Sequence, residues 1–288
     1  MDRLALGTVQ FGLDYGVANR QGQVPLEEIK RILTVAQAAG MNTLDTAIAY
    51  GDSEARLGQA GTADWRVVTK LPGLPPNETD IGNWVDSQAA ASLARLDADH
   101  LDALLLHRSA DLLGPTGSTF YAALQSLKSR GITKKIGVSV YGPDELDLIC
   151  PRFALDVVQI PFNLLDRRLI ASGSLMRLNE LGIEIHARSV FLQGLLLMTL
   201  KSRPSYFSRW QPLWARWHQW LADTGIPPLA ACLRFALAES GIARVIVGVD
   251  SLAQLQEVLA AAAGPLPPLP IDLRCDDPEL INPSRWQL

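Results

Sequence analysis

The chain has 288 residues, of which 48% are apolar, and it carries 26 basic against 30 acidic side chains. This length suits one large folded domain, and the near balance of interspersed charges excludes a strongly basic, nucleic-acid-binding protein. Three scattered cysteines, Cys150, Cys232 and Cys275, are too few for a disulfide framework and lack the spacing of a zinc site, so we expect ordinary thiols in a reducing compartment and no metal.

No segment of the sequence predicts export or membrane insertion. The N-terminus, MDRLALGTVQFG, lacks a charged lead followed by a long apolar core. The most apolar internal stretch, SVFLQGLLLMTL, is too short to span a bilayer. We therefore expect a soluble, cytoplasmic protein.

Short apolar runs alternate with helical patterns along the whole chain. The strands predicted in chain order cover residues 4–8, 42–45, 66–70, 101–107, 134–140, 155–160, 183–187 and 244–248. The helices predicted between them cover residues 26–39, 51–60, 82–96, 118–129, 143–149, 170–181, 228–239 and 251–262. Most strands are continuously apolar, which indicates that both of their faces are covered.

Four of these helices end at a glycine that is followed by an apolar residue and a strand. The glycines are Gly40, Gly131, Gly182 and Gly241, and we expect each to take the left-handed conformation that ends a helix. Eight such right-handed strand–helix units close a parallel barrel, so we predict an α/β protein with a (β/α)8 TIM barrel. One domain is expected over residues 1–288, with a C-terminal tail over 264–288 that starts at the proline-rich GPLPPLP.

An open, doubly wound sheet is the main alternative fold. No two glycines in the chain are spaced as G-x-G, so the glycine-rich dinucleotide fingerprint is absent, and so is a phosphate-binding GxxxxGK loop. We therefore favour the barrel.

Three successive predicted strands end in ionisable residues, Asp45, Lys70 and His107, and Tyr50 follows the first of them. Each residue alone has an ordinary structural explanation, as a turn cap, a surface charge or a core histidine. Barrel closure, however, gathers strand ends on one face, where the active sites of such barrels lie. An ammonium beside a tyrosine lowers the phenol pKa from about 10, and a neutral imidazole can orient a carbonyl oxygen. The set predicts a proton donor for a carbonyl that is being reduced.

The sequence resembles the aldo-keto reductase family from residue 6 to about residue 260. The matching stretches, in family order, are LGTVQFG, LDTAIAYGDSEARLG, VVTKLP, LLLHR, IGVSVYG, VVQIPFNLLDRR and VIVGVDSLAQL. The resemblance implies a barrel that moves a hydride between a nicotinamide cofactor and a carbonyl compound or alcohol. It implies that Tyr50 is the general acid/base, that Lys70 and Asp45 tune it, and that His107 positions the substrate oxygen.

The resemblance also implies the cofactor contacts. These are Gly7 and Thr8 at the nicotinamide ribose, Ser139 and Gln159 at the carboxamide, Ser189, Leu192, Gln193 and Gly194 along the pyrophosphate, and Gly248, Asp250 and Gln254 at the adenosine end. Two positions depart from the family pattern. Val140 stands where many members have an asparagine that contacts the carboxamide. Arg188 stands where an aromatic residue commonly stacks on the nicotinamide, and it can either stack there or pair with a neighbouring acid.

A third departure concerns the choice of cofactor. The family usually prefers NADP, yet no Lys or Arg occurs between residues 245 and 273, and Asp250 occupies the position expected near the 2′-phosphate. A carboxylate repels a phosphate but can accept hydrogen bonds from a free ribose. Arg244 or helix N-terminal amides remain as phosphate ligands. The family pattern favours NADP(H), with NAD(H) as the alternative.

The aromatic-rich stretch RWQPLWARWHQW has two interpretations. Trp210, Trp214 and Trp217 recur at helical spacing, which favours a packing stripe, but the stretch follows a strand end and can also form a substrate wall. We therefore include Phe162, Trp210 and Trp214 as candidate substrate residues. The pair Asp166 and Arg167 is interpreted as a structural ion pair.

The expected activity is NAD(P)H-dependent reduction of a small aldehyde or ketone, or the reverse oxidation of an alcohol. One alternative is a nicotinamide-binding redox sensor or regulatory subunit on the same barrel, with little turnover. Another is a barrel lyase or hydrolase that does not bind nicotinamide. The sequence identifies neither the substrate nor the oligomeric state.

Overall fold

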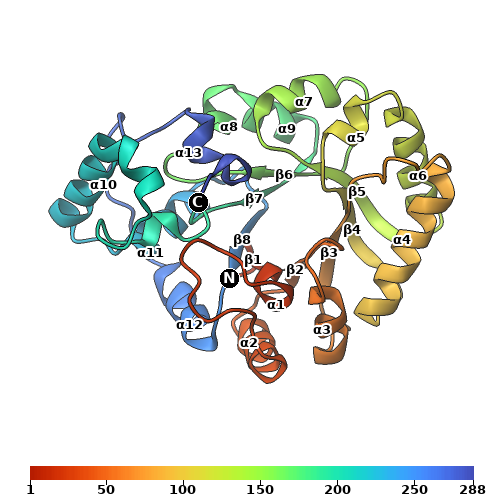
Figure 1. The fold of residues 1–288 in the computed structure, drawn as a ribbon, viewed down its shortest axis with the longest axis horizontal. Coiled ribbons are helices and arrows are strands. Elements are labelled where there is room, and N and C mark those ends of the chain that lie inside the picture. The colour runs from red at the N-terminus through yellow and green to blue at the C-terminus, as the bar shows by residue number, and fades with distance from the viewer.

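Eight parallel strands close into a barrel in the computed structural model, which describes residues 1–288 (Figure 1). Each strand pairs with the next in chain order, and the last pairs with the first, so the predicted barrel is confirmed. The strands are β1 Leu4–Gly7, β2 Thr43–Asp45, β3 Arg66–Leu71, β4 Leu101–Leu106, β5 Thr133–Ser139, β6 Val157–Pro161, β7 Glu184–Arg188 and β8 Arg244–Gly248.

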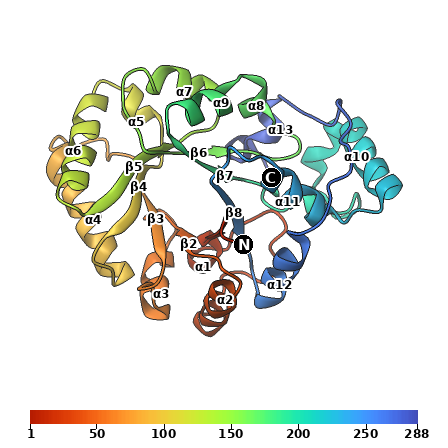
Figure 2. The same ribbon diagram turned by 180° about the vertical axis from the view of Figure 1, so that it is seen from behind.

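Helices surround the barrel and cover the outer faces of its strands (Figures 1 and 2). The α-helices are α1 Val9–Gly12, α2 Leu26–Ala38, α3 Ser53–Ala60, α4 Ile81–Leu96, α5 Ala110–Leu113, α6 Gly117–Ser129, α7 Pro143–Ile149, α8 Arg168–Ala171, α9 Ser174–Glu180, α10 Gln211–Thr224, α11 Pro228–Ala238, α12 Leu252–Ala261 and α13 Pro278–Ile281. Three short 3-10 helices are η1 Leu195–Leu197, η2 Ser205–Trp210 and η3 Pro283–Arg285. The helix predicted over 170–181 is in fact two, α8 and α9, because Gly173 at φ 74° interrupts it.

The predicted glycine ends hold at three of four positions. Gly40, Gly131 and Gly182 have φ values of 85°, 76° and 70°, in the left-handed region. The prediction for Gly241 is wrong, because α11 already ends at Ala238 and its cap residue Glu239 is extended at φ −80° and ψ 104°. The chain therefore leaves this helix without a left-handed residue.

The residues that follow Tyr50 fasten the front of α3 to the barrel. The buried Ser53 hydroxyl donates to the Thr8 carbonyl oxygen at 2.8 Å, and the buried Glu54 carboxylate accepts from Thr69 Oγ1 at 2.6 Å and Arg95 Nε at 2.8 Å. These contacts link α3 to the residue after β1, to β3 and to α4. The S-E pair after Tyr50 therefore fixes the loop that carries this tyrosine.

Close backbone packing requires glycine on both sides of this loop. A Cβ on Gly12 would lie 1.8 Å from the Tyr50 carbonyl oxygen, and Gly51 has φ 57° with the Gly12 carbonyl oxygen 2.4 Å from its Cβ position. Any side chain at either glycine would push α1 away from the Tyr50 loop.

Two members of the predicted stripe, Trp214 and Trp217, lie on the buried face of helix α10, whereas Trp210 ends η2 and is half-buried. Trp214, Trp217 and Trp220 are buried, and their indole N–H groups donate to the carbonyl oxygens of Phe207, Leu196 and Pro268. The helix lies at the edge of the molecule, outside the ring of barrel helices (Figures 1 and 2). These bonds attach α10 both to the loop after β7 and to the C-terminal tail.

No single helix is long and apolar enough to cross a membrane. The segments Ser205–Thr224 and Pro228–Ala238 reach that length and composition only as a pair, and they are bent by 93° relative to each other.

Candidate active site

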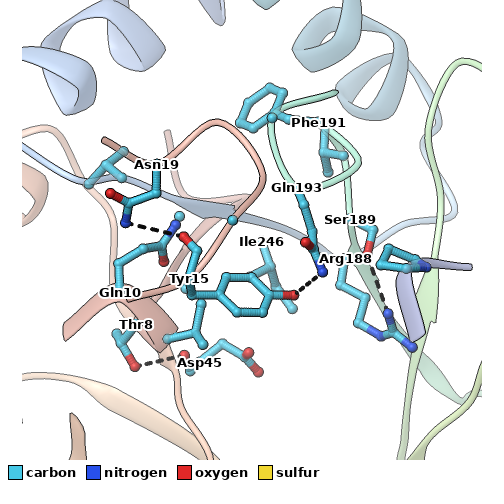
Figure 3. A pocket seen from close by; sticks show the side chains of 18 of the residues that line it. Thr8, Gln10, Tyr15, Asn19, Asp45, Arg188, Ser189, Phe191, Gln193 and Ile246 are labelled. Carbon is cyan, nitrogen blue, oxygen red and sulfur yellow. Dashed lines mark hydrogen bonds between the residues drawn. The ribbon is translucent and has the colours of Figure 1, made fainter. Parts of the chain in front are cut away.

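A cavity of about 570 Å³ opens at the carboxyl ends of the strands. Its walls come from the loop after β1, the loop after β7, the start of α12, and Pro283 and Ser284 of the tail. Figure 3 shows side chains from the β1 and β7 loops pointing toward one another across it. Because barrel topology places strand ends together here, residues distant in sequence become neighbours.

A buried ion pair lies at the base of the cavity. Lys70 Nζ donates to Asp45 Oδ1 at 2.9 Å, to Asp45 Oδ2 at 2.8 Å and to the Thr46 carbonyl oxygen at 2.8 Å. Lys70 is fully buried behind the lining, whereas Asp45 reaches it. These contacts use all three N–H groups of the ammonium, so Lys70 has no hydrogen left to donate to a tyrosine.

Tyr50 and His107 lie side by side next to this pair. Their ring centroids are 5.7 Å apart in an edge-to-face arrangement, and Lys70 Nζ is 5.2 Å from the centroid of the Tyr50 ring. Both side chains line the cavity. The structure thus brings together all four residues that the strand ends predict.

The pKa of Tyr50 moves in the direction opposite to the prediction. Burial and the Asp45 carboxylate raise the phenol pKa well above its usual value, and Arg188 is the cation that opposes this shift. Lys70, whose ammonium pairs with Asp45, does not offset the effect of burial on Tyr50. Tyr50 therefore keeps its proton at neutral pH, as a proton donor must.

His107 is neutral near pH 7. Burial, together with the positive charges of Lys70 and Arg188, lowers its pKa to about 4. A neutral imidazole can donate a hydrogen bond from one ring nitrogen while the other remains unprotonated. It can therefore orient a carbonyl oxygen without competing with Tyr50 as the acid.

This shift predicts a pH-dependent loss of stability. The pKa of a histidine in the unfolded chain is near 6.5, so between pH 6.5 and about 4 His107 is protonated in the unfolded chain and neutral in the folded protein. Protonation therefore favours the unfolded chain, and the free energy of unfolding decreases as the pH falls from 6.5 to about 4. In urea denaturation, the stability of the wild type should decrease more steeply over this range than that of His107→Gln. Equal pH slopes for the two proteins would contradict the assignment.

The residues predicted to bind a cofactor converge on the same cavity, with one exception. Those that line it are Gly7, Thr8, Ser139, Gln159, Arg188, Ser189, Gln193, Gly194, Gly248, Asp250 and Gln254. Leu192 does not line it, because its side chain is fully buried in the core while its backbone takes φ 49° in the loop after β7. A role for Leu192 is thus limited to shaping that loop.

The loop after β7 is held in an unusual conformation. Three non-glycine residues, Ser189, Leu192 and Gln193, have positive φ values of 59°, 49° and 54°, and Gly194 follows at 86°. Such backbone is costly for side-chain-bearing residues and is concentrated at functional sites. The loop is fastened across the cavity by Gln193 Nε2, which donates to the Tyr15 hydroxyl at 2.9 Å (Figure 3).

Several lining residues were not predicted from the sequence. Gln10 lies in the one-turn helix α1, Tyr15 and Asn19 come from the loop between α1 and α2, and Tyr141 follows β5. All four belong to segments that follow the carboxyl end of a strand, as Tyr50 does. Their polar groups carry no familiar spacing, so only the fold reveals that they share one cavity.

Gln159 is engaged within the protein. Its Nε2 donates to Asp45 Oδ1 at 2.7 Å, so this amide completes the shell of donors around the carboxylate. Asp45 thus accepts from Lys70 and Gln159 at the same time. The contact explains how a carboxylate with only 4% of its residue surface exposed remains solvated by the protein itself.

Arg188 neither pairs with an acid nor lies bare. Its guanidinium stacks over the Tyr141 ring at 4.7 Å, donates to the Val140 carbonyl oxygen at 2.9 Å and contacts Ser189 Oγ at 3.3 Å. The proposed pairing with a neighbouring acid is therefore not found. Val140 is fully buried, and its backbone serves Arg188.

The far end of the cavity is acidic. Asp250 and Glu257 line it, and burial raises the pKa of Asp250. Gln254 Nε2 lies 3.4 Å from Asp250 Oδ2, and Asn19 Nδ2 lies 3.5 Å from Oδ1, while no Lys or Arg lines this end. Arg244 is excluded as a phosphate ligand here, because it begins β8 and donates to Thr43 Oγ1 and the Ala243 carbonyl oxygen, whereas Gly248 at the other end of the strand lines the cavity.

The candidate substrate residues Phe162, Trp210 and Trp214 do not line the cavity. Phe162 is fully buried and stacks on Phe235 at a centroid distance of 5.0 Å, whereas Trp210 donates its indole N–H to Asp277 Oδ2 of the tail. The expectation that they form a substrate wall is therefore wrong, because Phe162 and Trp214 are buried in the core and the half-buried Trp210 packs against the core and the tail.

The ion pair predicted between Asp166 and Arg167 is also wrong. Asp166 pairs with Arg168 at 2.8 Å, whereas Arg167 donates to the carbonyl oxygens of Leu164 and Leu273.

Comparisons with known proteins agree with this architecture. The model of the Aldo/keto reductase family matches residues 3–272. The NADH-specific methylglyoxal reductase of Escherichia coli K12 is 27% identical over 91% of this chain and 90% of its own length, and D-threo-aldose 1-dehydrogenase of a Pseudomonas species is 28% identical over 91% and 92%. The holo form of an aldo-keto reductase from Bacillus halodurans has the same fold, with a TM-score of 0.73, 21% identity, and coverage of 92% of this chain and 87% of that one. The chain belongs to the aldo-keto reductase family, a family of oxidoreductases that act on carbonyl compounds.

Proposed function

We propose that this chain reduces a small aldehyde or ketone with NADH, and that Tyr50 donates the proton. The observation that carries the proposal is the cluster at the base of the cavity, where Tyr50 and His107 lie 5.7 Å apart beside the bonded pair Asp45 and Lys70. A redox sensor without turnover has no need of a protonated phenol next to a neutral imidazole. The cluster therefore favours an enzyme.

The cavity fits a nicotinamide dinucleotide by its size and by an unsatisfied polar group. Its volume of about 570 Å³ lies within the range typical of small-molecule sites. Gln10 Oε1 lines it and is buried without a hydrogen-bond partner in the protein, which marks a place for a ligand donor. Ser189 and Gln193 of the strained loop and Asp250 at the acidic end would hold the rest of the molecule.

The proposed chemistry divides the work among the residues at the base. A nicotinamide bound in the cavity would supply a hydride to the carbonyl carbon. Tyr50 Oη transfers its proton to the carbonyl oxygen, which gives the alcohol, and solvent then restores the proton to Tyr50. Neutral His107 donates a hydrogen bond that holds the carbonyl oxygen toward Tyr50. The Asp45–Lys70 ion pair packs beneath these two rings and holds their positions.

The acidic end of the cavity favours NAD(H) over NADP(H), which reverses the preference expected from the family pattern. Asp250 and Glu257 would lie near a 2′-phosphate with no cation lining that end to offset them. Like charges at short range disfavour binding, whereas a carboxylate readily accepts hydrogen bonds from a ribose diol. The similarity to an NADH-specific methylglyoxal reductase supports the same choice.

A paired titration tests both the activity and the cofactor. We expect NADH to quench protein fluorescence at lower concentration than NADPH, and to be consumed when aldehydes are added.

The variant Asp250→Asn tests the role of the carboxylate. It should lower the ratio of the NADPH Kd to the NADH Kd by about tenfold, the effect of removing one nearby charge. Asp86→Asn is the matched control, because Asp86 pairs with Arg130 away from the cavity and its loss changes the net charge equally. This variant should leave the ratio of the two Kd values unchanged.

The other outcomes separate the alternatives. Tighter binding of NADPH would overturn the proposed role of Asp250. Binding of NADH without turnover on a broad panel of carbonyl compounds would favour the redox sensor. Binding of neither cofactor would reject the reductase in favour of a lyase or hydrolase.

A further inference from the structure

Positive charge is in excess at the reactive end of the cavity. Arg188 is the one Lys or Arg side chain that lines the cavity. Lys70 lies behind the lining, and Asp45 balances its charge at 2.8 Å. Because His107 is neutral, with a pKa of about 4, the charge of Arg188 is the uncompensated one at this end.

No acidic side chain neutralises Arg188. Its hydrogen bonds go to the Val140 carbonyl oxygen at 2.9 Å and to Ser189 Oγ at 3.3 Å, which use two of the five N–H donors of a guanidinium. Arg168, by contrast, contacts both carboxylate oxygens of Asp166 at 2.8 Å. A buried or half-buried charge normally has such a partner, so Arg188 is poised for one that the protein does not supply.

Arg188 is also well oriented and close to the reacting groups. Its stacking on Tyr141 at 4.7 Å and its bond to Val140 hold the guanidinium plane at the ends of β5 and β7. Its charge lowers the pKa values of both Tyr50 and His107, which places it within electrostatic range of the carbonyl position. One small substrate could therefore place an anionic group at Arg188 and its carbonyl group at Tyr50.

We propose that Arg188 binds a carboxylate of the substrate, so that the preferred substrates are oxo acids, meaning small aldehydes or ketones that carry a carboxylate. The carbonyl group would face Tyr50 and His107, and the carboxylate would meet the free edge of the guanidinium, a geometry suited to paired N–H donors. This inference rests on the proposed reductase function and adds the substrate class to it.

The test compares each acid with its own methyl ester, which keeps the carbonyl and removes the charge. NADH consumption is measured for glyoxylate and succinate semialdehyde against the two esters. For the wild type, we expect kcat/KM to be about 10- to 100-fold higher for the acid of at least one pair, the effect of a hydrogen-bonded charge. Arg188→Met should bring the acid-to-ester ratio close to one, and Arg188→Lys should give an intermediate ratio because it keeps the charge and loses the planar fork.

Because both kcat/KM values in an acid-to-ester ratio are measured on the same variant, a general loss of activity caused by the substitution cancels from the ratio. Arg108→Met serves as the matched control, since Arg108 lies next to His107 but outside the lining and pairs with Asp111 at 3.7 Å; its ratio should equal that of the wild type. Circular dichroism and an NADH titration of each variant establish folding and cofactor affinity independently of turnover.

Two results would overturn the inference while leaving the reductase intact: equal kcat/KM for acids and esters with the wild type, or an unchanged acid-to-ester ratio in Arg188→Met. A loss of NADH affinity together with that unchanged ratio would assign Arg188 to the cofactor. Failure of the wild type both to bind NADH and to reduce any acid or ester would instead reject the proposed function itself.

Discussion

Tyr50→Phe is expected to lower kcat for carbonyl reduction by about 10²- to 10⁴-fold, the usual contribution of a positioned general acid. The phenylalanine ring keeps the edge-to-face packing on His107, and no protein group forms a hydrogen bond with the hydroxyl that is lost. NADH affinity and the melting temperature should therefore change little. Stopped-flow measurement of NADH oxidation, together with an NADH titration and a thermal melt, checks all three quantities.

Tyr15→Phe provides the comparison for this variant. Tyr15 lines the same cavity and its hydroxyl accepts a hydrogen bond from Gln193, so its removal loosens the β1 and β7 loops without removing a reacting proton. We expect the kcat of Tyr15→Phe to fall by less than about tenfold, the effect of one neutral hydrogen bond. Turnover of Tyr50→Phe equal to that of Tyr15→Phe would exclude Tyr50 as the proton donor.

Lys70→Met is expected to destabilise the fold by about 3–5 kcal/mol, the typical cost of removing one partner from a buried ion pair. The Asp45 carboxylate would remain buried with the Gln159 amide as its side-chain donor, and the Thr46 carbonyl oxygen would lose its contact with Lys70. Urea denaturation should reveal a lower midpoint. The kcat for carbonyl reduction should fall as well, because the Asp45–Lys70 pair packs against the Tyr50 ring.

A double-mutant cycle separates the loss of charge pairing from the loss of packing. Asp45→Asn removes the charge that Lys70→Met leaves unpaired, so the double variant should be more stable than the sum of the single changes predicts. Additive losses of stability would mean that the two residues contribute independently, contrary to the contacts of 2.8 and 2.9 Å between them.

The sequence predicts this barrel well because its strands are short, continuously apolar and separated by helices. The same regularity places Asp45, Lys70 and His107 at strand ends, and hence on one face, before any distance is known. The helix boundaries agree with the pattern except where a local glycine decides otherwise, as at Gly173, or where the helix stops early, as before Gly241.

Properties set by burial and by distant partners were not predictable from spacing. The direction of the shift in the Tyr50 pKa depends on how deeply the phenol is buried and on the Asp45 carboxylate nearby. The engagement of Gln159 with Asp45 joins residues 114 positions apart. The aromatic wall was misjudged for a similar reason, since helical spacing reveals that Trp214 faces something apolar but not whether that is a core or a ligand.

The pairing of β1 with β8 has a consequence for how the protein is made. Leu4 through Gly7 pair with Val245 through Gly248, so the barrel cannot close on a ribosome until the eighth strand has emerged from the exit tunnel. Before that moment the strands on either side of this seam lack a neighbour, and such unpaired strand edges favour aggregation. The cavity at the strand ends is therefore completed only late in biosynthesis, when the two ends of the chain meet.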